Sequence, residues 1–204
     1  GKTQEQVVAD LSELGVQLTK AGLSKYERGG SVPPASLLVP LGSVLSVPGD
    51  FFLAEPTATV EWRAFRKLAR VGKKQQERVQ ALAQRIVERQ VWLQEKLYPQ
   101  ARASLPKVTV TTGEQAEEAA SKVRKKWRLG EAPLESVTRT LEDNNCIVVD
   151  FAEEDGFHGL SGWANDAYPV TVTSSIGSND RRRVNLAHEL GHLVMRCQGL
   201  DEKQ

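Results

Sequence analysis

The feature that most constrains this 204-residue chain is a His-Glu-x-x-His pattern at positions 188–192. Apolar residues flank it at helical spacing, so we expect a helix with one buried side. His188 and His192 are four residues apart and would leave the same face of that helix, one turn apart. Two neutral imidazoles so placed can bind one Zn²⁺, and Glu189 beside them can take a proton from a metal-bound water. The pattern therefore predicts a zinc hydrolase site, with a chance pair of solvated histidines as the alternative.

A catalytic zinc ion needs a third protein ligand, which the pattern does not supply. Metzincins would continue with Gly at position 195 and His at position 198, but this chain has Met195 and Gln198. The remaining candidates downstream are Cys197, Asp201 and Glu202. The two carboxylates follow so closely that the chain would have to fold straight back. We therefore expect that the sequence is clipped and that the third ligand is absent from it.

Two polar residues upstream of the motif are further candidates for the site. His158 could contact the zinc or a scissile carbonyl, although a His near a turn is more often just a polar residue. Tyr168 could supply an oxyanion contact, but its place directly before Pro169 favours a structural role.

The composition is that of an ordinary globular protein, with 40% hydrophobic and 26% charged residues. No apolar run approaches the length of a membrane span, so we expect no membrane association. Cys146 and Cys197 are isolated thiols without disulfide spacing, which favours a reducing cytoplasm. The net charge of +1 is unevenly distributed, because residues 61–98 carry ten basic and four acidic side chains.

The first 55 residues contain the start and stop signals of three short helices. Thr3 followed by Gln6 is typical of an N-cap with a capping box. Thr19 is expected to cap a second helix, which would end at the glycines 29–30. The prolines 33–34 are expected to begin a third helix.

These signals, with the Leu-Ser-Lys-Tyr-Glu-Arg-Gly run at 23–29 and the Val-Pro-Gly-Asp-Phe-Phe-Leu run at 47–53, resemble a phage-repressor-type (XRE) helix-turn-helix domain without its first helix. The resemblance implies double-stranded DNA as a partner, with the second helix in the major groove. It implies that Gln4 faces phosphate. The residues implied to face bases or backbone are Lys20, Ala21, Ser24 and Lys25. The alternative is a fold of this kind kept as a protein–protein or dimerisation module.

Residues 56–105 are interpreted as a basic helical connector. Apolar residues recur at spacings of three, four and seven, which predicts one long helix over 60–98, with a break at Gly72 as the alternative. The predicted seam consists of Val79, Leu82, Ile86, Leu93 and Leu97. Such a helix could span two domains or pair with its copy in a homodimer.

The order of elements after residue 105 predicts an α+β domain. Helices are expected over 113–129 and 133–144, and strands over 146–151, 156–164 and 168–173. With the Arg-Arg-Val-Asn-Leu-Ala-His-Glu-Leu-Gly-His-Leu run at 182–193, this order resembles the ImmA/IrrE-type metallopeptidases. The resemblance implies a zincin-like domain over 106–204, zinc bound by His188 and His192, and Glu189 as general base.

Two functions follow from the combined resemblances. The first is a DNA-binding regulator with a zinc-dependent endopeptidase domain, whose protein substrate would be a repressor or an antitoxin. The second is a non-catalytic transcriptional regulator whose metal domain senses zinc or a ligand. The sequence identifies neither the substrate nor the operator.

Overall fold

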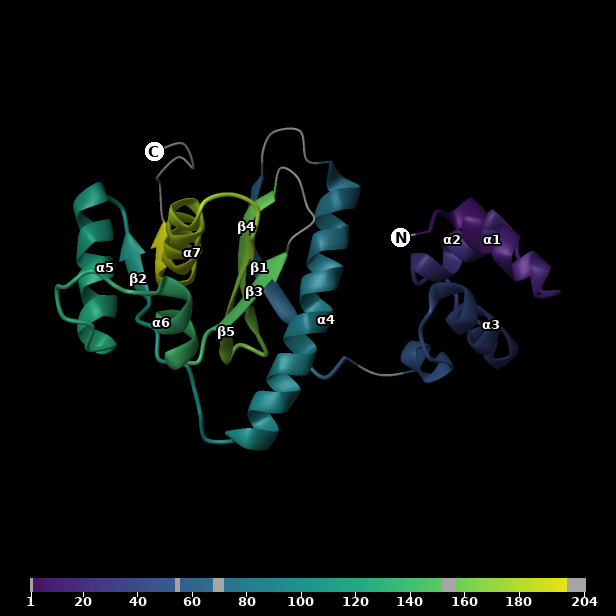
Figure 1. Ribbon diagram of the computed structural model, residues 1–204, viewed down its shortest axis with the longest axis horizontal. Coiled ribbons are helices and arrows are strands. Elements are labelled where there is room, and N and C mark those ends of the chain that lie inside the picture. Colours follow the sequence, from purple (N-terminus) through teal and green to yellow (C-terminus); the bar gives the residue numbers. More distant parts are fainter. Residues whose placement is uncertain (1, 54–55, 68–71, 152–156, 198–204) are drawn as a thin grey trace. The chain divides into compact units, whose positions relative to one another are not determined.

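The computed structural model describes residues 2–53, 56–67, 72–151 and 157–197 (Figure 1). The chain divides into two compact units, Gly1–Glu55 and Pro56–Gln204. Each unit is described by itself below. Within the described residues, no helix is both long enough and apolar enough to cross a bilayer.

The first unit is a small helical body. It contains α1 (Gln4–Glu13), α2 (Lys20–Glu27), α3 (Ala35–Leu45) and the 3₁₀ helix η1 (Gly49–Phe52). The predicted caps are confirmed: Gln6 N donates to Thr3 Oγ1 at 3.2 Å, Thr3 N donates back to Gln6 Oε1 at 2.8 Å, and Thr19 caps α2. The buried side chains that hold these helices together are Val7, Leu11, Leu23, Leu37, Leu41 and Val44.

The second unit is built on a four-stranded mixed sheet with the order β1-β4-β5-β3. The strands are β1 (Val60–Lys67), β3 (Ile147–Phe151), β4 (Phe157–Ala164) and β5 (Tyr168–Ser174). β4 is antiparallel to both β1 and β5, whereas β3 runs parallel to β5.

The predicted single helix over 60–98 is wrong in its first part. Residues 60–67 form β1, with Val60 opposite Ala164 of β4, and only Lys73–Leu97 form a helix, α4. Val60-Glu61-Trp62-Arg63 alternates apolar and polar residues, which is a strand pattern. Pairing with a strand about 100 residues away thus decides the conformation.

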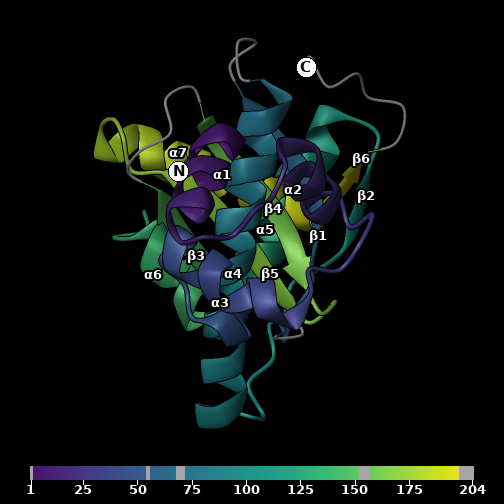
Figure 2. The same cartoon turned by 90° about the vertical axis from the view of Figure 1, so that its right-hand side faces the viewer.

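Helices cover both faces of the sheet (Figures 1 and 2). α4 packs on one face through a row of fully buried side chains that repeats every four residues. This row consists of Val79, Ala83, Val87 and Val91.

The predicted apolar seam of this helix is only partly right. Val79 lies in the buried row and Ile86 packs beside it. Leu82, Leu93 and Leu97 are 39%, 49% and 59% exposed. The pairing of α4 with a second copy therefore stays a prediction.

The other face of the sheet carries α7 (Asn179–Val194), with α5 (Gly113–Lys126) and α6 (Val137–Asp143) packed beyond it. α6 begins at Val137 instead of Pro133, because the Ser136 hydroxyl accepts from Arg139 N and caps the helix there. After α7, β6 (Met195–Cys197) pairs in parallel with β2 (Val108–Val110). A mixed α+β architecture is thus confirmed.

Candidate metal centre

The predicted histidine helix is present as α7. It begins at a Ser178 cap, whose hydroxyl accepts from Arg181 N at 3.3 Å, and Asp180 lies in its first turn. Leu186, Leu193 and Val194 are buried between the helix and its neighbours. This apolar side fixes which way the rest of the helix faces.

The two imidazoles of α7 converge. Nε2 of His188 lies 3.0 Å from Nε2 of His192, and the ring planes are nearly perpendicular, at 88°. Two nitrogens bound tetrahedrally to one zinc ion at about 2.0–2.1 Å would be about 3.4 Å apart. His188 is exposed and His192 is half-buried, so a metal ion could reach both. The residues therefore fit two ligands of a zinc site.

Glu189 lies on the sheet side of α7 and is fully buried. Its side chain presses against the backbone of β4 at Gly159. A β-carbon added to Gly159 would lie 2.7 Å from Cδ of Glu189 and 2.9 Å from Cγ. The sequence pattern puts Glu189 beside the imidazoles; the structure adds that the carboxyl group is enclosed between helix and sheet.

The sheet beneath this part of α7 is polar. Ser161 and Thr171 face each other on β4 and β5, both are fully buried, and neither hydroxyl has a hydrogen-bond partner among the described residues. Asn185 of α7 is buried here as well. Burying polar groups is costly, and the opposite face of the sheet, under α4, is apolar by contrast.

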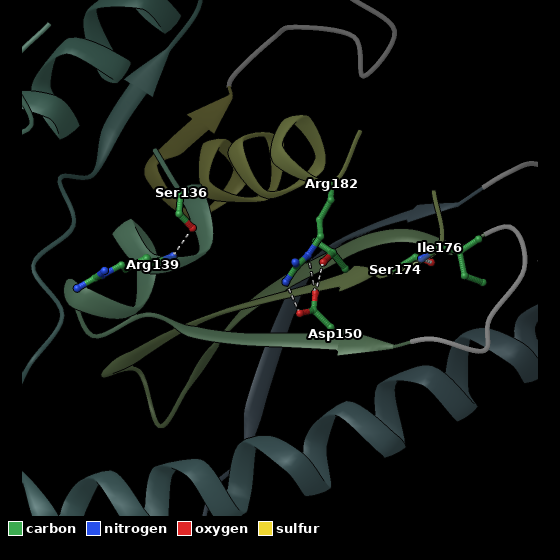
Figure 3. A network of polar contacts seen from close by, with 7 residues as sticks. Ser136, Arg139, Asp150, Ser174, Ile176 and Arg182 are labelled. Carbon is green, nitrogen blue, oxygen red and sulfur yellow. Dashed lines mark hydrogen bonds and ion pairs between the residues drawn. The ribbon is translucent and has the colours of Figure 1, made fainter. Parts of the chain in front are cut away.

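Asp150 at the end of β3 holds the beginning of α7 (Figure 3). It accepts from Arg182 through both carboxylate oxygens, with Nε to Oδ1 at 3.2 Å, and from the Thr173 hydroxyl at 2.9 Å. Arg183 donates to the backbone carbonyls of Leu134 and Glu135 ahead of α6. Sequence reasoning missed Asp150 and Gly159; a glycine inside a strand was the available signal for close packing.

Among the residues that the structure describes, no group of three His, Cys, Asp or Glu side chains is placed to hold a metal ion. The candidates Asp201 and Glu202, and the side chain of Cys197, lie outside the described residues. His158 is half-buried on β4. The Tyr168 hydroxyl lies 3.4 Å from Glu95 Oε1 of α4, on the opposite face of the sheet from α7, so it does not serve as an oxyanion contact.

An apolar cavity of about 300 Å³ lies on another side of α7. α7 contributes Ala187, Leu190 and Val194 to its wall, and α5 and α6 close it. Neither histidine lines it. The cavity is therefore separate from the histidine pair.

The predicted DNA-contacting residues all lie on α1 and α2. The Gln4 amide donates to Glu27, and Lys20 forms an ion pair with Glu5. The Lys20 ammonium lowers the pKa of the Glu5 carboxyl. Two of the five predicted residues are thus already engaged within the protein. Of the other three, Ala21 and Lys25 are exposed and Ser24 is half-buried.

Comparison of the chain with models of known protein families gives no match, and comparisons with curated proteins and with solved structures give none either.

Proposed function

We propose that this chain carries a zinc-dependent peptidase site on α7 and a DNA-binding surface on α1 and α2. The observation that supports the first part most directly is the 3.0 Å separation of the two Nε2 atoms on an exposed side of α7. Imidazole pairs a turn apart are a common zinc-binding arrangement.

In this proposal each residue has one task. His188 and His192 hold the zinc ion, with a third ligand outside the described residues. Zinc, when bound, supplies a Lewis acid that polarises a peptide carbonyl and activates water. Glu189 moves the proton between that water and the leaving amine. The protein substrate would be a repressor or an antitoxin, so that cleavage relieves repression.

The second candidate is a non-catalytic regulator whose metal domain senses zinc or a ligand. Complete burial of Glu189 favours it, because a general base must come within hydrogen-bonding distance of its proton. The binding of zinc would then alter the packing of α7, and the N-terminal helices would read out the change on DNA.

Three proteins decide between these functions: the native chain, H188A/H192A and E189Q. We expect the native chain to bind one zinc ion, H188A/H192A to bind none, and E189Q to bind zinc normally. With labelled, unfolded casein as the probe, E189Q should lose cleavage that the native chain shows. A native chain without zinc affinity contradicts the peptidase and the zinc sensor, and leaves only a sensor of another ligand. Zinc binding without cleavage supports the sensor, and undiminished cleavage by E189Q refutes the assigned base.

A further inference from the structure

Among the described glycines, Gly159 is the one whose missing side chain makes room for a carboxyl group of the proposed centre. Non-bonded carbon atoms normally lie about 3.5–4.0 Å apart. A β-carbon at position 159 would lie 2.7 Å from Glu189 Cδ and closer still to Oε1. Alanine at this position would therefore have to displace the Glu189 side chain, the strand or both, and the Glu189 side chain is fully buried, so it has no adjacent solvent to move into.

Other crowded glycines have a different neighbour. A β-carbon at Gly162 would meet the backbone oxygen of Glu61 at 2.5 Å, so that glycine serves strand pairing. At Gly113 a β-carbon would meet nothing within 4 Å. Close approach to a functional side chain is thus a property of position 159 and not of glycines in this fold generally.

The sheet around Gly159 suits a carboxyl group. Every second residue of a strand lies on the same face, so residues 159, 161 and 163 of β4 lie on the face that α7 covers. In the strand register, Gly159 lies opposite Thr173 of β5. Ser161, fully buried, adds a hydroxyl group to this face, while the buried Thr173 hydroxyl on the neighbouring strand donates to Asp150. An apolar side chain at 159 would replace a polar surrounding with hydrocarbon.

We propose that Gly159 is a positioning residue for Glu189: the bare backbone of β4 sets where the carboxyl group lies relative to the two imidazoles. This inference rests on the proposed function, because position matters only if Glu189 transfers a proton. Misplacement of a catalytic group by about 1 Å can lower a rate by about 10²-fold.

The contact itself is tested by thermal unfolding, without any assay of activity. We expect Gly159→Ala to lower Tm by about 4–10 °C in the native background, because overpacking is destabilising. In a Glu189→Ala background the same change should lower Tm by less than about 2 °C, since the crowding atoms are gone. Gly113→Ala is the matched control, with no drop in either background. An equal drop in both backgrounds, or failure of G159A/E189A to fold, overturns the proposal.

The positioning role is tested on the zinc-loaded full chain with labelled casein. We expect Gly159→Ala to lower kcat by about 10²-fold, while its zinc affinity, measured against a chromophoric chelator, and its KM stay near native values. E189D, whose carboxyl group is retracted from the strand, should lose no further activity when Gly159→Ala is added.

The outcomes separate two failures. If the native chain binds no zinc and cleaves nothing, the proposed function fails, while the unfolding series still decides whether position 159 controls Glu189. If the native chain cleaves casein and Gly159→Ala has an unchanged kcat, or zinc affinity falls in parallel with kcat, the positioning role is overturned and the proposed function stands.

Discussion

Arg182 in the first turn of α7 holds the carboxylate of Asp150 at the end of β3 with two hydrogen bonds. The two side chains are about one-third exposed, at 33% and 34%. A bidentate pair of this kind fixes direction as well as distance. It therefore sets the orientation in which α7 lies on the sheet, ahead of the first histidine.

Removing this pair should destabilise the second unit. We expect Arg182→Ala to lower the free energy of unfolding by about 1–2 kcal/mol, because Asp150 keeps only its bond from Thr173. For a chain of this size that corresponds to about 2–8 °C in Tm. Arg181→Ala, next to it on the exposed side of the helix, is the control and should change Tm by less than about 1 °C. Equal changes in Tm for the two substitutions would show that the Arg182–Asp150 pair makes no specific contribution to stability.

DNA binding should depend more on Lys25 than on Lys20. Lys25 is exposed, whereas Lys20 is engaged by Glu5 and would have to leave it. With a duplex of random sequence, we expect Lys25→Ala to reduce the slope of log affinity against log salt by about 0.9. Lys20→Ala should reduce it by less. The control is Lys2→Ala, which removes an ion pair with Asp10 on α1. Unchanged binding by all three variants would favour a protein–protein role for the first unit.

Alkaline pH should destabilise the protein through Cys146. Burial raises the pKa of this thiol to about 12. Above about pH 9 the unfolded thiol loses its proton while the folded one keeps it, so stability falls with rising pH until about pH 12. The expected slope from this group is about 1.4 kcal/mol per pH unit. In urea unfolding at several pH values, the free energy of unfolding of Cys146→Ala should fall less steeply above about pH 9 than that of the native chain. Identical pH dependence of the two proteins would contradict the burial effect.

If the chain forms a homodimer through α4, the contact should depend on the exposed apolar side chains of this helix. The side chains that bind the sheet are not available for pairing, so Leu93 and Leu97 would carry the contact. We expect L93N/L97N to shift a dimer to the monomer mass in light scattering after size-exclusion chromatography. Val39→Asn, which changes an exposed apolar side chain of α3, should leave the mass unchanged. A native chain that is monomeric at all concentrations would refute this dimer.

The parts of the fold that the sequence predicts well are those decided by neighbours along the chain. The Thr3 and Thr19 caps and the helical spacing of His188 and His192 depend on residues three or four apart, and these are confirmed. The assignment of residues 60–67 is wrong because their partner strand is distant, and helix and strand patterns compete in a short segment.

The distinction between contacts of neighbouring residues and contacts of distant residues also applies to the candidate site. The histidine pair could be predicted, but the contact of Glu189 with Gly159 joins residues 30 positions apart, and that of Arg182 with Asp150 joins residues 32 apart. Such contacts follow from strand order and register, which a single sequence does not reveal. The burial of Glu189 was missed for this reason.

The short parallel pair of β2 and β6 gives α7 a second anchor. Met195, three residues after His192, is already opposite Val108 in the ladder. The segment with both imidazoles is therefore held on its N-terminal side by the contact with Asp150. On its C-terminal side it is held by β6, whose partner β2 leads directly into α5. A ligand or substitution that displaces residues 108–110, far upstream in the chain, would therefore act on the strand that continues directly from the histidine helix, without touching either ring.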